Sequence, residues 1–238
     1  MSKPGTPFKS PTPAKPKSSA QPNPAAEANA LWRLDEWRPS LTADQKARFR
    51  LFHAELLKFN PKVNLISRAT EREADELHFM DCLMAAEMVL QLDLPKRVFD
   101  IGSGNGFPGV IFPILDESRE YVLVESDARK CEFIKHVVSA LKLSKVTVAN
   151  VRFENLGNAG LEVAMSRGFA SISKTLLASN KIFSKGGRFI HLKGPGWSSE
   201  IAELPSQLIS VWEPELLGEY FLPATQQRRA IVVTQKKV

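Results

Sequence analysis

A short stretch in which three glycines alternate with other residues constrains the fold more than any other part of the chain. Residues 97–109 read Arg-Val-Phe-Asp-Ile-Gly-Ser-Gly-Asn-Gly-Phe-Pro-Gly. Val98, Phe99 and Ile101 have the bulk of a buried parallel strand. Pro108 suits the first position of a helix, where no N–H is needed. The stretch therefore predicts a strand, a glycine loop and a helix, an arrangement that presents backbone N–H groups to nucleotide-like ligands.

The spacing of the glycines indicates the kind of ligand. A dinucleotide-binding loop has the pattern Gly-x-Gly-x-x-Gly, whereas here Gly102, Gly104 and Gly106 lie at every second position. Preceded by Asp100, this arrangement is similar to the loop of class I methyltransferases, which lies under S-adenosylmethionine. Glu125 ends a second apolar strand 23 residues after Gly102, near the offset of a carboxylate that binds both ribose hydroxyls. The alternative is a structural turn and a solvated acid.

Composition limits the classes of protein to which the chain can belong. Its 238 residues can form one hydrophobic core with a small appendage. No apolar run approaches the roughly 20 residues that span a bilayer, and we expect no secretory segment. Cys82 and Cys131 lie far apart without metal-ligand spacing, so we expect reduced cysteines, no metal site and a cytoplasmic protein. We also expect a monomer. The net charge of +6 is compatible with a nucleic-acid partner.

Composition also changes along the chain. Residues 1–29 are rich in Pro, Ala, Ser and Lys, which predicts a disordered tail, because too little apolar surface is present to offset the entropy of ordering. Residues 30–94 carry helical patterns, with a capping box at 42–45 and a helix end at 60–61, and predict a helical cap. Residues 95–238 predict the main domain.

Strand and helix patterns alternate in the main domain. After the first strand, we expect strands at 121–125, 146–149, 163–165 and 188–192 and helices at 134–141 and 176–183. Two late apolar runs, 208–212 and 230–234, have no helical segment between them and predict an antiparallel pair that closes the sheet. The expected fold class is α/β, a Rossmann-like doubly wound sheet that is mostly parallel, with its ligand at the carboxyl ends of the strands.

Several motifs share their order and spacing with one family. They are Asn60–Ser67, His78–Asp81, Gly102–Gly109, Val151–Glu154, and Ser166-Arg167 with Phe169–Ser171. From about Trp32 onward, the chain resembles the bacterial 16S rRNA guanine-N7 methyltransferases, also called the glucose-inhibited division protein B (GidB, RsmG) family. The resemblance implies a class I fold, S-adenosylmethionine as the cofactor and methylation of guanine N7 in a hairpin loop near the decoding centre. The implied partner is 16S rRNA, the small ribosomal subunit or its assembly intermediate.

The two resemblances also imply a set of cofactor contacts. These are Gly102, Gly104, Gly106, Phe107, Glu125, Phe153, Glu154 and Arg167. Glu125 has the ribose role. The backbone at Phe153 and the carboxylate of Glu154 suit the donors and acceptors of adenine, although a buried Phe beside a surface Glu is the alternative.

Candidate substrate contacts come from loops, from the second helical motif and from a strand end. They are Asn64, Arg68, His78, Asp81 and Lys193. Lys193 suits a phosphate, while a structural or solvated side chain is the alternative reading of such residues. Leu77 and Cys82 depart from the family pattern, which has an arginine and a serine there, and this bears on the contacts near His78.

The target atom follows from the same resemblance and from the chemistry of guanine. N7 carries a lone pair in the ring plane and needs no deprotonation, so proximity and alignment suffice, and we assign no catalytic acid or base. Methylation of an exocyclic amine or of a pyrimidine carbon calls for a polar-Pro-Pro-aromatic loop after the fourth strand or a nucleophilic Cys after a proline. Here the fourth strand leads into Met165–Phe169, and neither cysteine follows a proline. Two alternatives stay open, namely a small-molecule or protein methyltransferase and a non-catalytic RNA- or ribosome-binding protein. The intact glycines argue against the latter.

Overall fold

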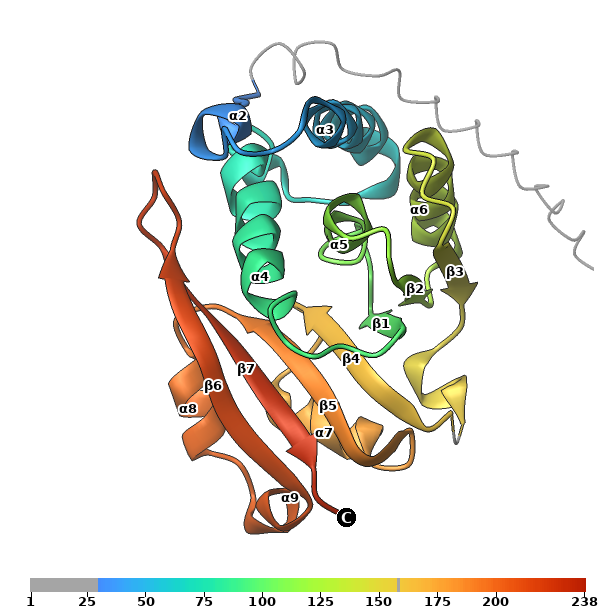
Figure 1. Ribbon diagram of the computed structural model, residues 1–238, viewed down its shortest axis with the longest axis vertical. Helices are drawn as coiled ribbons and strands as arrows, with labels where there is room; N and C mark the ends of the chain where they lie inside the picture. Colours follow the sequence, from blue (N-terminus) through green and yellow to red (C-terminus); the bar gives the residue numbers. More distant parts are fainter. Residues whose placement is uncertain (1–29, 158) are drawn as a thin grey trace, which may run out of the picture.

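The central feature of the fold is a seven-stranded sheet with the strand order β3-β2-β1-β4-β5-β7-β6 (Figure 1). The computed structural model describes residues 30–157 and 159–238, so the tail predicted for residues 1–29 lies outside the described residues. The strands are β1 (Arg97–Ile101), β2 (Glu120–Glu125), β3 (Val146–Asn150), β4 (Leu161–Arg167), β5 (Phe183–Lys193), β6 (Trp212–Phe221) and β7 (Arg228–Lys236).

The strand order creates a switch point beside β1. This strand pairs in parallel with β2 on one side, where Ile101 lies opposite Val124, and with β4 on the other, where Asp100 lies opposite Met165. The carboxyl ends of strands on the two sides of such a switch point border a crevice that binds ligands. β7 is antiparallel to both β5 and β6. The predicted doubly wound, mostly parallel sheet with an antiparallel pair at its end is therefore confirmed.

Helices cover both faces of the sheet (Figure 1). They are α2 (Leu34–Trp37), α3 (Ala43–Val63), η1 (Arg68–Thr70), η2 (Asp75–Met80), α4 (Asp81–Val89), α5 (Ile111–Leu115), α6 (Ala128–Ala140), η3 (Phe153–Leu156), α7 (Ile172–Ser179), α8 (Trp197–Ala202) and α9 (Ser206–Val211). Successive strand residues point to opposite faces, so Val163 and Met165 join the core with α3 to α6, and Ala164 joins the core with α7. No helix among the described residues is both long and apolar enough to cross a bilayer.

Contacts between aromatic rings pack the helical cap against the glycine loop. The ring of Phe107 stacks on that of Phe52 in α3 at 4.8 Å between centroids, and it meets Phe79 of η2 edge-on at 4.9 Å. Gly106 has a φ of +90°, and a Cβ at this position would lie 3.1 Å from Cζ of Phe52. A larger residue would push α3 away from the loop. The predicted boundary of the cap at 94–95 falls in the connection between α4 and β1.

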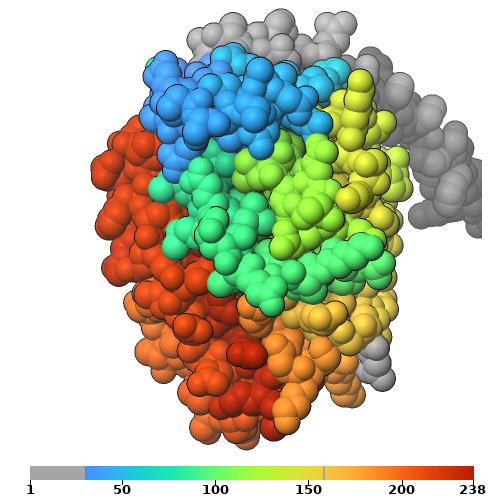
Figure 2. All heavy atoms as spheres, in the orientation of Figure 1, coloured from blue at the N-terminus to red at the C-terminus, as the bar shows by residue number. Residues whose placement is uncertain are grey.

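The tip of the β6–β7 hairpin lies against the same cap. In Figure 2 the C-terminal strands, in red, border the cap helices, in blue and green. Oε1 of the buried Glu76 accepts the N–H groups of Ala224 at 2.7 Å and Thr225 at 2.8 Å. The hydroxyl of Tyr220 donates to Oδ1 of Asp81 at 2.8 Å. Side chains of the cap thus bind β6 and the turn between the last two strands.

The longest helix of the cap, α3, ends later than its sequence predicts. α3 continues through Pro61 to Val63, and the expected end at 60–61 is wrong. Oδ1 of Asn60 accepts the N–H groups of Leu65 at 2.7 Å and Ile66 at 2.8 Å. These bonds stabilise the chain reversal beyond the last turn. Pro61 removes one helical hydrogen bond, and these side-chain bonds offset that loss.

Pro108 does not begin a helix, contrary to the prediction. The N–H of Gly109 donates to Oδ2 of Asp100 at 3.1 Å, so the first N–H after the proline is bound by a side chain rather than by a helical carbonyl. α5 begins three residues later, at Ile111, whose N–H donates to the carbonyl of Pro108 at 2.8 Å. The strand, loop and helix occur in the predicted order with a longer loop.

The helix predicted at 176–183 begins and ends earlier. Ser171 is the N-cap of α7, and its side chain accepts the N–H of Lys174. Phe183 belongs to β5. The apolar residues of the predicted helix therefore divide between a helix and the strand that follows it.

The late run at 208–212 was predicted as a strand, and this is wrong for all but its last residue. Residues Ser206–Val211 form α9, and the strand begins at Trp212. β6 lies at the edge of the sheet and contains Pro214 together with several exposed acidic residues. Edge strands carry such residues, which hide the apolar alternation from sequence analysis. The predicted antiparallel pairing with β7 is confirmed.

Candidate active site

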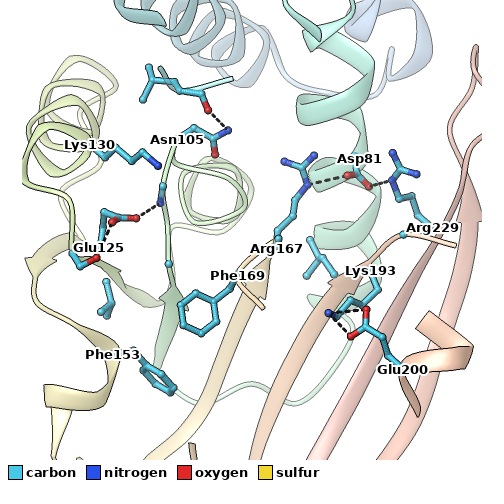
Figure 3. Close-up of a pocket in the computed structure, with 18 of the residues that line it drawn as sticks. Asp81, Asn105, Glu125, Lys130, Phe153, Arg167, Phe169, Lys193, Glu200 and Arg229 are labelled. Atoms are coloured by element: carbon cyan, nitrogen blue, oxygen red, sulfur yellow. Dashed lines mark hydrogen bonds and ion pairs between the residues drawn. The ribbon is translucent and has the colours of Figure 1, made fainter. Parts of the chain in front are cut away.

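A cavity of about 830 Å³ opens at the carboxyl ends of β1, β2, β4 and β5 (Figure 3). Cavities that bind small ligands have volumes of about 300 to 1,000 Å³. Seven of the predicted site residues line it, namely Asp81, Gly102, Gly104, Glu125, Phe153, Arg167 and Lys193. The structure therefore brings residues from separate motifs together at the switch point of the sheet.

Glu125 lies at the end of β2 with its carboxylate held by two backbone groups. Oε2 accepts the N–H of Gly104 at 2.8 Å, and Oε1 accepts the N–H of Asp127 at 2.7 Å. Asp127 is the N-cap of α6, so the carboxylate joins the glycine loop to the helix that follows β2. A carboxylate has about four acceptor positions. Those that remain suit the two hydroxyls of a ribose.

The glycine loop forms the neighbouring wall of the cavity. Gly102 and Gly104 have φ values of +71° and +52°, in the left-handed region that favours glycine. A Cβ on Gly104 would approach nothing closer than the carbonyl oxygen of Gly102, at 3.6 Å. Glycine at position 104 is therefore explained by backbone conformation and by space for a ligand rather than by packing within the protein.

A second carboxylate, that of Asp100, lies buried in the strand beneath the loop. Its Oδ2 accepts the N–H of Gly109, while its Oδ1 has no hydrogen-bond partner among the described residues. Burial raises the pKa of Asp100 to about 7. Burial thus disfavours the charged form of Asp100, which does not line the cavity, so the carboxylate that faces a ligand beside the loop is that of Glu125. It favours a ligand that carries positive charge, as a sulfonium with an amino group does.

Phe153 and Glu154, which follow β3, differ in their placement. Phe153 is buried and lines the cavity. Glu154 is exposed and does not line it. The alternative considered for this pair, a buried Phe beside a surface Glu, describes the geometry.

Arg167 ends β4 and is held by the junction of η2 and α4. Its Nε donates to Oδ2 of Asp81 at 3.0 Å, and its Nη2 donates to the carbonyl of Leu77 at 2.7 Å. Both terminal nitrogens lie 3.2 Å from Nδ1 of His78. Leu77 thus contributes its backbone carbonyl, which any residue at this position would supply.

The contact with Arg167 fixes the protonation state of His78. A guanidinium only donates, so Nδ1 of His78 accepts and its proton is on Nε2, which lies 3.3 Å from Oγ1 of Thr70. Burial, together with Arg167 and Arg229, lowers the pKa of His78 to about 3. His78 is therefore a neutral acceptor that positions Arg167. The other departure, Cys82, is fully buried, and burial raises its pKa.

Asp81 is the centre of this network (Figure 3). Besides Arg167, its carboxylate binds the hydroxyl of Tyr220 at 2.8 Å and Nε of Arg229 at 3.4 Å. A buried carboxylate needs such compensation. Asp81 therefore joins the cap, β4 and the C-terminal hairpin at the edge of the cavity.

Lys193 lines the cavity, but its ammonium group is already paired. Nζ lies 2.8 Å from Oε2 of Glu200 in α8 and donates to the carbonyl of Ala170 at 2.8 Å. Glu200 also accepts the N–H of Ile172 at 2.7 Å. The structure therefore places Lys193 in an ion pair that supports the loop between β4 and α7, rather than as an unpaired phosphate ligand.

Other predicted residues lie away from the cavity lining. Gly106 and Phe107 pack against the cap, as described above. Asn64 and Arg68 are exposed on the loop after α3. Asn64 has a φ of 62° and is the C-cap of that helix. The left-handed conformation at the end of the helix explains the asparagine at position 64 without a substrate contact.

Some residues that line the cavity were not predicted. Among them are Lys130, Phe169, Glu200 and Arg229. Lys130 lies in the first turn of α6, directly after β2, and this position was a usable signal. Glu200 and Arg229 come from α8 and β7, and no local pattern in the sequence connects them to the glycine loop.

Solved structures share this fold. A variant of MtNAS solved in complex with S-adenosylmethionine superposes with a TM-score of 0.55 and 16% identity, covering 82% of this chain and 76% of that one. A predicted O-methyltransferase from Agrobacterium tumefaciens superposes with a TM-score of 0.52 and 18% identity, covering 67% and 82%. The fold is that of the class I S-adenosylmethionine-dependent methyltransferases.

Sequence comparison shows the family. The model of the GidB family, rRNA small subunit methyltransferase G, matches residues 45–219, and the chain belongs to this family. It is 46% identical over 206 residues to the ribosomal RNA small subunit methyltransferase G 3 of Bdellovibrio bacteriovorus, covering 86% of this chain and 93% of the relative. It is 35% identical to the ribosomal RNA small subunit methyltransferase G of Roseiflexus castenholzii, covering 76% of this chain and 82% of the relative. The protein is thus an S-adenosylmethionine-dependent methyltransferase.

Proposed function

We propose that the protein transfers the methyl group of S-adenosylmethionine to N7 of a guanine in 16S rRNA, in a hairpin loop near the decoding centre. The observation that carries the proposal is that one cavity joins a ribose acceptor, Glu125, to the basic side chains of Arg167 and Arg229. Relatives named as small-subunit rRNA methyltransferases support an RNA substrate. The substrate is 16S rRNA, the small subunit or an assembly intermediate, and we infer a cytoplasmic monomer.

The cofactor, in this proposal, lies along the ends of β1, β2 and β3. Glu125 accepts the ribose hydroxyls, Gly104 leaves room for the methionine part beside the backbone of Gly102, and Phe153 packs against the adenine. When bound, S-adenosylmethionine supplies an electrophilic methyl group on a sulfonium. Glu154 and the side chain of Phe107 have no direct contact, since neither residue lines the cavity.

The cavity suits a nucleophile that needs no base. His78 has its Nδ1 lone pair directed at Arg167 and a pKa of about 3. The carboxylates of Asp81 and Glu200 bind cationic side chains at 2.8 to 3.4 Å. Guanine N7 attacks with its own lone pair, so the protein has only to exclude water and align the reacting atoms.

Basic residues of the cavity have the charge needed for RNA. Arg229 and Lys130 lie on opposite sides of it (Figure 3), and Arg68 is exposed on the loop after α3. Contacts of such side chains with phosphates give affinity that falls with salt concentration. We therefore assign Lys130 and Arg68 to the backbone of the RNA rather than to the guanine, whereas Arg229, like Lys193, is already paired, with Asp81 at 3.4 Å.

Methylation of defined RNA tests the proposal. Small subunits and deproteinised 16S rRNA from cells that lack this enzyme are incubated with the protein and radiolabelled S-adenosylmethionine. Borohydride and aniline then cleave the RNA at 7-methylguanine. We expect one cleavage site within a hairpin loop. Label in a small molecule, in a ribosomal protein or at another RNA atom would contradict the proposal, as would tight RNA binding without transfer of label.

A further inference from the structure

Phe169 is the one aromatic side chain of the cavity lining that is not buried. It lies in the loop between β4 and α7 and is 36% exposed, whereas the other ring of the lining, Phe153, is 3% exposed. Figure 3 shows the ring of Phe169 extending into the cavity. The proposed cofactor contacts do not use this ring. A large apolar side chain left in a binding cavity indicates a contact with a ligand.

The backbone on both sides of Phe169 is held in place. Arg167 is bonded to the cap, as described above, and the carbonyl of Ala170 accepts from Nζ of Lys193 at 2.8 Å. Between them, Gly168 has a φ of +64°, which turns the chain so that the next side chain enters the cavity. The ring is therefore presented by a short, anchored loop.

The ring lies between the two halves of the cavity. A Cβ on Gly102 would lie 2.5 Å from Cδ2 of Phe169, so the ring borders the end of β1. On its other side lie Arg167, at the end of β4, and Lys193, at the end of β5 (Figure 3). The methyl group must pass from the half with Glu125 to the half with Arg167. Phe169 borders the place where donor and acceptor meet.

We propose that the target guanine stacks on the ring of Phe169, an inference that rests on the proposed function. A base taken out of an RNA loop loses its stacking partners, and aromatic side chains replace them. Stacking contacts only the face of the base. It fixes the plane of the guanine and leaves the ring edges free, and N7 attacks in that plane. Phe169 thereby aligns the N7 lone pair with the methyl group without touching it.

Stacking also changes in strength during the reaction. As N7 attacks, positive charge moves from the sulfonium to the purine. A cationic ring is attracted to the face of an aromatic ring more strongly than a neutral one. Phe169 therefore stabilises the transition state more than the bound substrate, which raises kcat as well as affinity.

Substitution of Phe169 in the full-length protein tests this assignment. Single-turnover rates on rRNA are measured for Phe169→Leu, Phe169→Tyr and the wild type, and affinity for S-adenosylhomocysteine is measured by calorimetry. Loss of one base–aromatic stack costs a factor of about 10 to 100. We expect that loss for Phe169→Leu with unchanged cofactor affinity, and nearly full activity for Phe169→Tyr. Leu177, an exposed apolar residue of α7 outside the cavity lining, is the control, and Leu177→Ala should leave both quantities unchanged.

Other outcomes would overturn the proposal in distinguishable ways. Full activity of Phe169→Leu would show that the ring only fills space. Cofactor affinity that falls in parallel with the rate would assign Phe169 to the cofactor. A wild-type protein that leaves guanine N7 unmethylated would overturn the proposed function and this inference together. Active wild type with an active leucine variant would overturn this inference alone.

Discussion

The backbone N–H of Gly104 and Oε2 of Glu125 are joined by a hydrogen bond of 2.8 Å. Through it the glycine loop and the end of β2 support each other before any ligand arrives. The acceptor proposed for the ribose is therefore oriented in advance, which reduces the ordering cost of binding.

Replacing Glu125 by Ala should weaken binding of S-adenosylhomocysteine by about 1 to 3 kcal/mol, because two hydroxyls lose their acceptor. The change also removes the bonds to Gly104 and Asp127, so thermal stability should fall too. A 2′,3′-dideoxy analogue of the ligand separates these effects in calorimetry. The wild type should prefer the natural ligand and Glu125→Ala should not. A variant that keeps the preference would exclude the ribose role.

Replacing Gly104 by Asp should abolish cofactor binding. A Cβ there would lie 4.0 Å from Oε2 of Glu125, so the new carboxylate would enter the ligand space beside an existing negative charge. Gly104→Ala is the control, since it adds only the strain of the left-handed conformation, about 1 to 2 kcal/mol. Circular dichroism verifies folding. Unchanged affinity in a folded Gly104→Asp protein would rule out the assigned site.

Replacing Asp81 by Asn should lower the free energy of unfolding by about 3 to 5 kcal/mol, because the partly buried Arg167 and Arg229 would lose their buried counter-charge. Urea denaturation measures the change. Glu132→Gln is the control, since Glu132 pairs with Lys135 on the surface at 2.9 Å and should lose only about 0 to 1 kcal/mol. Equal effects would mean that the Asp81 network adds no stability.

The single-turnover rate should be nearly constant from pH 6 to 9 when cofactor and RNA are saturating. His78 has a pKa of about 3, so the ring is neutral throughout this range and no proton leaves it. His78→Gln should lower the rate by freeing Arg167 but should leave the profile flat. A tenfold rise per pH unit that disappears in His78→Gln would establish a general base.

The protein should lose stability as pH falls below about 6.5. Burial lowers the pKa of His53 to about 4 and the pKa values of His78 and His191 to about 3. Below pH 6.5 each of these histidines takes up a proton on unfolding. The free energy of unfolding is therefore highest above pH 6.5 and falls as the pH approaches the pKa of the folded form. Asp100 has a raised pKa of about 7 in the folded protein, so near pH 5 it releases one proton on unfolding. This offsets the proton uptake of one histidine. The net slope is about 2 to 3 kcal/mol per pH unit near pH 5, measurable by urea denaturation at pH 5 and 7. Equal stability at the two pH values would contradict it.

The parts of the site that could be predicted are those fixed by local spacing. A strand, alternating glycines and a second strand ending in an acid place Gly104 and Glu125 at one edge of the sheet. The same pattern does not say which way a loop residue faces. Gly106 and Phe107 therefore looked like cofactor contacts, although their neighbours are Phe52 and Phe79 of the cap.

The rest of the site depends on pairs that are distant in the chain. The sequence predicts a phosphate contact for Lys193, and the structure places it in an ion pair with Glu200. This pair forms only when α8 folds back on β5, so no local pattern indicates it. Arg229 pairs with Asp81 from the last strand. The edge strand β6 likewise shows no clear apolar alternation in its sequence. Its register is set by pairing with β7.

The contacts between the cap and the C-terminal hairpin bear on synthesis. Glu76 and Asp81 find their partners 139 to 149 residues later in the chain. A ribosome releases the cap first, so both carboxylates would be buried without these hydrogen bonds if the cap closed at that stage. Folding of the first helices must therefore wait for the last two strands. A nascent chain stalled before Tyr220 would expose the apolar side of its cap to chaperones and proteases.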